Sequence, residues 1–232
     1  MRYQQATRVI DKMKKATENQ IFAYLVGLTV GDGHLESRSK RIVINSSREE
    51  YIRKISSLFA ELQIPASCFF DKAANEWKLA TRSAMLYDLF INKFGVIAGN
   101  KIIARMNLQI PVEDISYFLA GLYDAEGWHD LDKDKYLRIR LKINNQSVAE
   151  FVFESLKRLG FEVRRHQNKN SFVVDINKQA HTKRFVQEIP LLHPRWFKIS
   201  KSLLVTAEAP NLLGYTRATM AGTMGCNSEK RS

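Results

Sequence analysis

Two acidic residues stand at matching places in a stretch that the sequence contains twice. The first copy, YLVGLTVGDGHLE, contains Asp32, and the second copy, FLAGLYDAEGWHD, contains Glu126. Carboxylate oxygens are hard ligands that suit Mg²⁺, whose remaining positions are taken by water and phosphate. Two such acids brought together from the two copies would therefore suit a magnesium site that is completed by water and phosphate.

Each copy has the pattern of a buried helix that ends at its acid. Apolar residues recur at helical spacing through 21–28 and through 115–122. Glycine at Gly27 and Gly121 costs roughly 1 kcal/mol of helix propensity at each position, so it needs a packing reason. We expect that the two helices pack on each other through these glycines. The separation of the copies is about the length of a small domain, which indicates an internal duplication.

The acids stand where they weaken the helices that carry them. Gly33 and Gly127 follow the acids and are expected to stop the helices. The carboxyl end of a helix carries partial negative charge, so an acid there costs about 0.3–1 kcal/mol. Packed helices would bring Asp32 and Glu126 side by side, where two carboxylates need a cation or a shared proton between them. An acid at the unfavourable end of a helix in both halves predicts a functional site.

Both stretches resemble the LAGLIDADG motif of homing endonucleases and related maturases. The second copy, LAGLYDAEG, matches the motif at seven of nine positions, and the first copy, LVGLTVGDG, matches at five. The resemblance extends over about 20–190 and indicates the single-chain type with two repeats. It implies that Asp32 and Glu126 are the catalytic residues and bind the metals, with the backbone carbonyls of Gly31 and Ala125 as further ligands.

The resemblance also bears on the residues around these acids. Asp124, the earlier acid of the second copy, corresponds to a position that is not catalytic in the family, and the first copy has Val30 there. The family usually places a basic and a polar residue around the metals to order the water. The candidates for these roles here are His129, Arg48 and Gln146.

Hydrophobic periodicity predicts an α+β fold made of two tandem αββαββα repeats. Together with the resemblance, this implies a saddle with approximate two-fold symmetry and two packed helices at its centre. The expected divisions are a basic N-terminal arm (1–19), the first repeat (20–94), a linker (95–113), the second repeat with a C-terminal helix (114–207) and a disordered tail (208–232).

Several boundaries follow from local signals. Ser46 or Ser47 is expected to cap the helix that begins near Glu49, and Asn145 or Ser147 to cap the corresponding helix of the second half. A short helix is expected over 101–106, and a final amphipathic helix over 196–207.

The clearest strand is 136–143, in which apolar and basic residues alternate. Because side chains alternate at period two, one face of this strand belongs to the core and the other carries a row of cations. A two-stranded ribbon fits the major groove of DNA, and many basic side chains would contact only phosphate. The basic residues expected on this surface are Arg38, Lys40, Arg41, Lys72, Lys78, Arg82, Arg138, Arg140, Lys142, Arg164, Arg165 and His166.

Composition limits the partners and the compartment. The 232 residues carry a net charge of +12, which favours a polyanion such as duplex DNA, RNA or an anionic surface. Two cysteines, Cys68 and Cys226, provide no framework of disulfides and indicate a reducing compartment. The chain contains no apolar stretch of membrane-spanning length and no signal-like start. We expect a cytoplasmic protein, or one of an organelle matrix or nucleoid in a eukaryotic host.

The resemblance implies an intron-encoded homing endonuclease that acts as a monomer with internal pseudo-two-fold symmetry. It would read a long DNA site through the major groove and cut both strands, leaving short 3′ overhangs. Two or three Mg²⁺ ions shared by the acids would activate water and stabilise the leaving oxygen, with Mn²⁺ able to substitute and Ca²⁺ able to bind without cleavage. The alternative is an intron RNA maturase on the same fold, although binding RNA does not require paired acids. A transcription regulator would be expected to lose the acids, and an intein would need flanking splicing domains.

Overall fold

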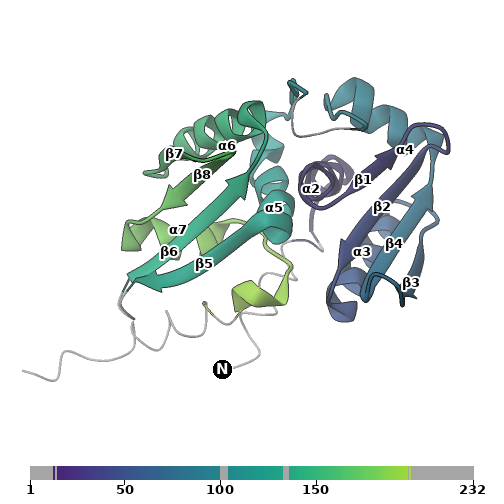
Figure 1. The fold of residues 1–232 in the computed structure, drawn as a ribbon, viewed down its shortest axis with the longest axis horizontal. Coiled ribbons are helices and arrows are strands. Elements are labelled where there is room, and N and C mark those ends of the chain that lie inside the picture. The colour runs from purple at the N-terminus through teal and green to yellow at the C-terminus, as the bar shows by residue number, and fades with distance from the viewer. Residues whose placement is uncertain (1–12, 14, 100–103, 133–135, 198, 200–232) are drawn as a thin grey trace, which may run out of the picture.

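The computed structural model describes residues 13, 15–99, 104–132, 136–197 and 199. It consists of two similar halves, each with a four-stranded antiparallel sheet, and two helices, α2 and α5, between the sheets (Figure 1). This confirms the predicted α+β fold of two repeats. The first half contains α2 (Glu18–Gly31), β1 (His34–Glu36), β2 (Arg41–Ser46), α3 (Glu49–Glu61), β3 (Ser67–Asp71), β4 (Glu76–Arg82), α4 (Ala84–Asp88) and a π-helical turn (Leu89–Lys93).

The second half repeats this order. Its sheet runs β5-β6-β8-β7, which corresponds to β1-β2-β4-β3 of the first sheet. The elements are a short 3₁₀ turn (Val112–Asp114), α5 (Ile115–Glu126), β5 (Gly127–Asp132), β6 (Tyr136–Ile143), α6 (Gln146–Arg158), β7 (Arg164–Asn168), β8 (Ser171–Ile176) and α7 (Gln179–Glu188).

The central helices α2 and α5 are in backbone contact. A Cβ atom added to Gly27 would lie 2.0 Å from the carbonyl oxygen of Phe118, and one added to Gly121 would lie 2.0 Å from the carbonyl oxygen of Tyr24. Any side chain at either glycine would therefore push the helices apart. The prediction that the glycines allow these helices to pack on each other is confirmed.

The glycines that follow the acids act differently from the prediction. Neither Gly33 nor Gly127 adopts the left-handed conformation of a typical helix stop. The C-cap residue of α2 is Asp32, which precedes Gly33. Gly127 has φ −78° and ψ 149° and begins β5 directly. A Cβ atom on Gly33 would lie 2.5 Å from the Cα atom of Thr29, so glycine is required there by close approach. Gly160, which follows α6, has φ +76° and is a left-handed helix stop.

Strand β1 begins after Gly33, one residue beyond Asp32, and β5 begins directly after Glu126. They pair with β2 and β6, with His34 opposite Val43 and Trp128 opposite Arg140. These strands complete the four-stranded sheets, although no strand was located at these positions from the sequence. Each acid therefore stands at the junction between a central helix and the edge strand of its own sheet.

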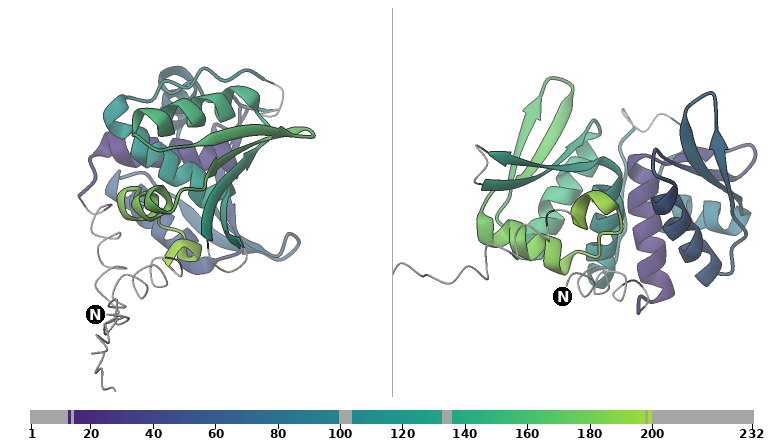
Figure 2. Two further views of the ribbon diagram at one scale, coloured as in Figure 1. Left: turned by 90° about the vertical axis from the view of Figure 1, so that its left-hand side faces the viewer. Right: turned by 90° about the horizontal axis from the view of Figure 1, so that it is seen from below.

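Each sheet has an inner face in the core and an outer face. The apolar residues of β2, β4 and β6, such as Ile44, Leu79 and Ile139, are fully buried on the inner faces against α3 and α4 or against α6 and α7. Within the described residues, no helix covers the outer faces. The hairpins β3–β4 and β7–β8 project on the two sides of the central helices, which gives the molecule the shape of a saddle (Figure 2, right).

The helix boundaries test the predicted caps. Asn145 caps α6, because its Oδ1 atom accepts a hydrogen bond of 3.1 Å from the backbone N–H of Val148. The prediction for α3 is wrong, because its N-cap residue is Arg48 and no side chain caps this end. Ser46 instead accepts a hydrogen bond of 3.1 Å from the Arg48 N–H, which places the helix start after both serines.

The linker and the termini are described only in part. Residues 104–106 are not helical, and the rest of the predicted linker helix, 101–103, lies outside the described residues. Residues 194–197 and 199 are helical, with Trp196 buried, whereas 200–207, the tail 208–232 and most of the arm 1–19 lie outside. Among the helices described, none combines the length and the apolar character needed to span a membrane.

Candidate functional site

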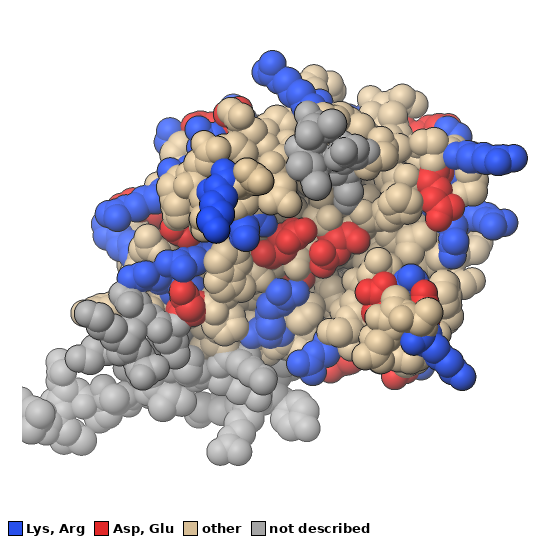
Figure 3. Space-filling model, viewed as in Figure 1, with Lys and Arg blue, Asp and Glu red and all other residues tan. Residues whose placement is uncertain are grey.

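The two acids lie on helix ends that touch. A Cβ atom added to Gly31 would lie 2.5 Å from the Ala125 Cβ atom and 3.1 Å from the Glu126 Cγ atom, so the glycine allows the ends of α2 and α5 to converge. Asp32 is exposed and Glu126 is partly exposed, so both carboxylates reach the surface. Acidic side chains gather near the centre of this face, between the two halves, with Lys and Arg side chains around them (Figure 3).

The donor atoms at this place suit a hydrated divalent cation. Within the described residues, no group of three or more His, Cys, Asp or Glu side chains is arranged to hold a metal ion. Mg²⁺ is commonly bound through one or two carboxylates together with waters and substrate phosphates, rather than in a cage of protein ligands. Two carboxylates at converging helix ends, next to the carbonyls of Gly31 and Ala125, fit that kind of site.

Arg195 binds the end of α5 beside Glu126. Its guanidinium donates hydrogen bonds to the carbonyl oxygens of Asp124 and Gly127, each at 2.7 Å, and to that of Ala125 at 3.3 Å. These carbonyls belong to a helix end, where backbone acceptors lack helical partners and the partial charge is negative. A cation is therefore favourable there. Arg195 also takes up one acceptor site of the Ala125 carbonyl, which was predicted to bind metal.

Asp124 is fully buried and connects three parts of the molecule. Its Oδ2 atom accepts hydrogen bonds from the Tyr24 hydroxyl at 2.7 Å and from the Leu192 N–H at 2.6 Å, and Tyr24 Oη lies 3.0 Å from Tyr51 Oη. Burial raises the pKa of Asp124 to about 7, although these bonds and the charge of Arg195 act to lower it. Asp124 thus faces the interior, whereas Glu126, two residues later, faces the surface.

His193 holds Arg195 in place from the other side. Its Nδ1 atom accepts hydrogen bonds from the Arg195 Nε at 3.0 Å and from the Arg195 backbone N–H at 3.1 Å. The imidazole lies edge-on to Tyr51, with ring centroids 4.7 Å apart. Burial, and next the charge of Arg195, lowers the pKa of His193 to about 3, so the ring is neutral and can accept these bonds.

Sequence reasoning missed this network because its contacts join distant parts of the chain. Arg195 and His193 stand in the segment after α7, which carries no repeat and no recognised motif. The useful signal was the acidic residue Asp124 inside a buried apolar helix, since a buried carboxyl group requires partners.

The residues proposed to order water near the acids are placed differently from the expectation. His129 pairs with Ile139 across the sheet and faces inward, with its ring centroid 5.7 Å from that of Trp196. Its proposed role at the acids stays a prediction. Gln146 donates a hydrogen bond of 2.8 Å to Glu150 on the surface of α6. Arg48 is exposed at the start of α3, and its charge acts on His193.

Two of the predicted cations on the strands of the first sheet are compensated by acids. Arg41 lies 3.7 Å from Glu36, and Lys78 lies 2.7 Å from Asp71 and 3.5 Å from Glu76. The hydrogen bond with Asp71 raises the pKa of Lys78. The exposed residues Arg38 and Lys72 stand in the turns of the two hairpins, and exposed Arg82 ends β4.

Lys40 does not lie on the surface predicted for it. Its ammonium group lies 3.3 Å from Asp88 of α4 and 4.3 Å from the ring centroid of Tyr87. The side chain therefore lies against the helix layer and not on the outer face of the sheet.

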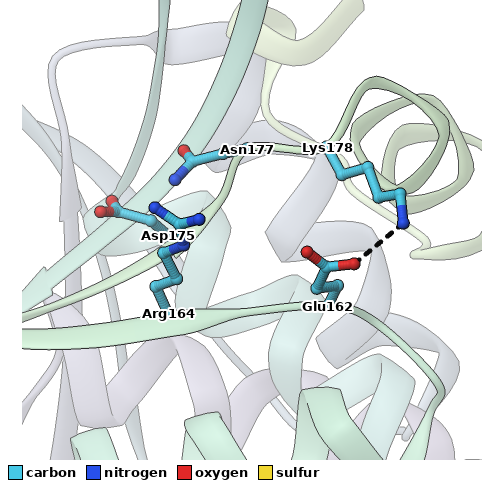
Figure 4. Close-up of a pocket in the computed structure, with 5 residues that line it drawn as sticks. All are labelled: Glu162, Arg164, Asp175, Asn177 and Lys178. Atoms are coloured by element: carbon cyan, nitrogen blue, oxygen red, sulfur yellow. Dashed lines mark hydrogen bonds and ion pairs between the residues drawn. The ribbon is translucent and has the colours of Figure 1, made fainter.

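The second sheet carries its cations on β6 and β7. Arg140 lies 3.1 Å from Asp130 and 3.2 Å from Asp175, and His166 lies 3.5 Å from Asp175. Arg164 points toward Asp175 at the edge of a depression of about 250 Å³ (Figure 4). Burial raises the pKa of Asp175, although the charge of Arg140 acts to lower it.

The other predicted cations of this sheet do not all point to the same face. Lys142 is exposed and Arg138 partly exposed on the outer face of β6, as expected. Arg165 instead pairs in register with buried Val174 and lies 3.3 Å from Glu150 of α6, so it faces the helix layer. The prediction that Arg164, Arg165 and His166 all lie on the DNA-facing surface is wrong for the middle residue.

Comparison with known proteins agrees with this geometry. The family model described as a LAGLIDADG-like domain matches the chain twice, over residues 19–95 and 113–190. A curated relative, the homing endonuclease I-DmoI of Desulfurococcus mucosus, is 32% identical over 153 residues, which is 60% of this chain and 71% of that protein.

Solved structures share the fold. Mesophilic variants of I-DmoI align with a TM-score of 0.57 and 23% identity over 81% of this chain and 100% of theirs. I-DmoI in complex with DNA and Mn aligns with a TM-score of 0.54 and 24% identity over 76% of this chain and 99% of that chain. Full-length DUF199/WhiA from Thermatoga maritima aligns with a TM-score of 0.59 and 14% identity over 83% of this chain but 62% of that one. With two matched repeats and two converging motif acids, this chain belongs to the LAGLIDADG family.

Proposed function

We propose that this protein is an intron-encoded homing endonuclease that makes a site-specific break in double-stranded DNA. The observation that carries the proposal is the convergence of Asp32 and Glu126 on touching helix ends, at the centre of the face flanked by the two sheets. The relationship to the homing endonuclease I-DmoI supports a DNA endonuclease. The net charge of +12 supports a polyanionic substrate.

The central helices position the acids for two reactions related by symmetry. Because α2 and α5 contact each other through equivalent glycines, their ends present Asp32 and Glu126 in nearly equivalent positions. Two or three Mg²⁺ ions bound by these acids would supply an activated water and stabilise the leaving 3′ oxygen, with Mn²⁺ as a substitute and Ca²⁺ as a non-cleaving ligand. The water oxygen bonds to phosphorus and the bond to the 3′ oxygen breaks, leaving a 5′ phosphate and a 3′ hydroxyl. Symmetric attack across the minor groove gives short 3′ overhangs.

The two outer faces would hold a long duplex site in the major groove. Each four-stranded sheet would follow one half of the site, and side chains of β2, β4, β6 and β8 alternate between the core and this face. Exposed cations such as Lys142, Arg82 and Lys72 would contact phosphates. Because one chain supplies both halves, the protein acts as a monomer.

The test is cleavage selection. The full chain is incubated with a randomised duplex library and Mg²⁺, and the new ends are sequenced for the wild type, Asp32→Ala and Glu126→Ala. Glu154→Gln is the matched control, because Glu154 is an exposed acid on α6, away from the helix ends. We expect a long, partly palindromic consensus with staggered cuts in the wild type and the control, and a loss of cleavage of at least about a thousandfold in either acid variant.

Other outcomes would redirect the proposal. Tight binding to a duplex without cleavage by the wild type would favour a DNA-binding regulator. If the protein ignores duplex DNA but binds structured intron RNA and promotes splicing, the maturase function replaces the endonuclease.

A further inference from the structure

The outer face of the first sheet is hollowed. A depression of about 340 Å³ lies over all four strands of this sheet, and its lining includes His34, Val43, Asn45, Phe69 and Lys78. Phe69 is 39% exposed, although it is a large aromatic residue on an edge strand. An exposed aromatic side chain beside a polar floor is a common feature of a binding surface.

Strand pairing places three of these residues in one row. Asn45 of β2 and Phe69 of β3 both lie opposite Lys78 of β4. Adjacent strands are separated by about 4.8 Å, so Asn45 and Phe69 stand about 10 Å apart on the same face. This separation is comparable with the width of the major groove of DNA.

The charges of the depression are compensated within the sheet. The Lys78 ammonium lies 2.7 Å from Asp71 and its side chain is only 22% exposed, and Arg41 lies 3.7 Å from Glu36. These ion pairs reduce the attraction of the depression for phosphate. What it offers to a ligand is an amide at one end and an aromatic ring at the other.

The amide of Asn45 has unused hydrogen-bonding capacity. Its Oδ1 atom is buried and has no hydrogen-bond partner among the described residues. A buried acceptor without a partner is destabilising, so such a group in a native structure requires an explanation. Rotation of the amide out of this position brings its oxygen and its nitrogen to the surface together, so that one acceptor and one donor can face a ligand.

We propose that this depression reads adenine and thymine in the half of the DNA site that lies over the first sheet. Asparagine can form two hydrogen bonds with the N6 and N7 edge of adenine, and an apolar side chain can contact the 5-methyl group of thymine. Asn45 is assigned to adenine and Phe69 to a thymine methyl group. The inference rests on the proposed binding of DNA and adds which bases one part of the protein selects.

The experiment uses base analogues that remove single groups. In the site found by cleavage selection, each thymine is replaced in turn by uracil, which lacks the methyl group, and each adenine by 7-deazaadenine, which lacks the N7 acceptor. Dissociation constants are measured with Ca²⁺ in place of Mg²⁺. We expect one uracil to weaken binding about fourfold, as for one buried methyl group, and one 7-deazaadenine to weaken it about fivefold.

Protein variants assign these effects to residues. Phe69→Ala should bind the thymine and uracil duplexes equally, and Asn45→Ala should bind the adenine and 7-deazaadenine duplexes equally. Phe70→Ala is the matched control, because Phe70 is the next residue of β3 but lies on the opposite face, with its ring centroid 5.4 Å from that of Trp77. The control should keep both sensitivities, and thermal melting verifies that each variant is folded.

The outcomes separate this inference from the proposed function. If the unmodified duplex is bound but no analogue weakens binding, the base-reading role is wrong and the endonuclease proposal stands. If the sensitivities remain in Phe69→Ala and Asn45→Ala, other residues read these bases and the assignment is overturned. If no duplex is bound at all, both proposals fail together.

Discussion

Helices α2 and α5 contact each other through equivalent atoms, but the surroundings of their carboxyl ends differ. Gly27 packs against the backbone carbonyl of Phe118, and Gly121 packs in the same way against the backbone carbonyl of Tyr24. Two residues before each motif acid, however, the first half has buried Val30 and the second has Asp124. Only hydrophobic contact is required of Val30, whereas Asp124 requires hydrogen bonds from Tyr24 and Leu192. The symmetric contact between the helices brings Asp32 and Glu126 together. A polar network is added at the helix end that carries Glu126.

Two kinds of constraint therefore act on the site: a steric contact between the helices and a polar hydrogen-bond network. The contact between the helix backbones tolerates no side chain in either half, so both glycines are required for the same steric reason. The polar network joins Asp124 of α5 to Tyr24 of α2, to Tyr51 of α3 and to the segment after α7, and it is built from side-chain hydrogen bonds, not from contact between backbones. Substitutions in the two regions should therefore have different patterns of effect.

The largest expected effect comes from Gly27→Ala and Gly121→Ala. Each new Cβ atom would lie 2.0 Å from a backbone carbonyl oxygen, which cannot rotate away as a side chain could. We expect each variant to lose about 3 kcal/mol of the free energy of unfolding, near the top of the range for overpacked cores. Urea unfolding measures the loss. A large effect of one substitution with tolerance of the other would show that the helix contact is not symmetric in solution.

The next effect concerns Arg195, which binds backbone carbonyls at the end of α5 and the start of β5. Arg195→Gln removes charged hydrogen bonds to three carbonyl oxygens at the helix end. We expect a loss of about 2 kcal/mol of the free energy of unfolding, and a smaller loss for Arg195→Lys, which keeps the charge but not the planar fork. Arg158→Gln is the control, since Arg158 is an exposed arginine in the last turn of α6 and should change stability by less than about 0.5 kcal/mol. Equal effects of Arg195→Gln and the control would remove Arg195 from this role.

The pH dependence of stability should separate Asp124 from His193. The pKa of Asp124 rises from 3.8 to about 7 on folding, so its protonated native form adds stability at low pH that is lost as the pH rises toward 7. The pKa of His193 falls from 6.5 to about 3, so its neutral native form adds stability above pH 6.5 that is lost as the pH falls toward 3. Between about pH 4 and pH 6.5 the two contributions oppose each other.

Single substitutions at Asp124 and His193 separate the contribution of each group to the pH dependence of stability. In Asp124→Asn, stability should rise with pH between about 4 and 6.5, because the His193 contribution remains alone. In His193→Gln, stability should fall with pH up to about 7, because the Asp124 contribution remains alone. Urea unfolding at a series of pH values measures both slopes. Parallel profiles for the two variants would contradict the assignment.

Much of the fold could be predicted because its signals are local. The apolar spacing of α3 and α6 and the alternation in β6 determine which residues enter the core, and the repeat identifies both acids. Strand alternation could also have excluded one cation, since consecutive residues Arg164 and Arg165 cannot lie on the same face of β7. Arg195 could not be found in this way, because its partners on α5 are far away in the sequence and it follows no periodic pattern.

The smallest expected effect compares one lysine from each sheet. Lys142 is exposed on the outer face of β6 and has no ion pair within the described residues, whereas Lys78 of β4 is held 2.7 Å from Asp71. A lysine that neutralises a phosphate releases a counterion on binding, and one already paired with a carboxylate does so much less. Lys142→Ala should therefore lower the slope of log affinity against log salt concentration by about one, and Lys78→Ala should change it by much less. The measurement is a salt titration of binding to the selected duplex with Ca²⁺. Equal changes in slope would mean that the Lys78–Asp71 pair opens on DNA, and that the two sheets contact phosphates alike despite their different ion pairs.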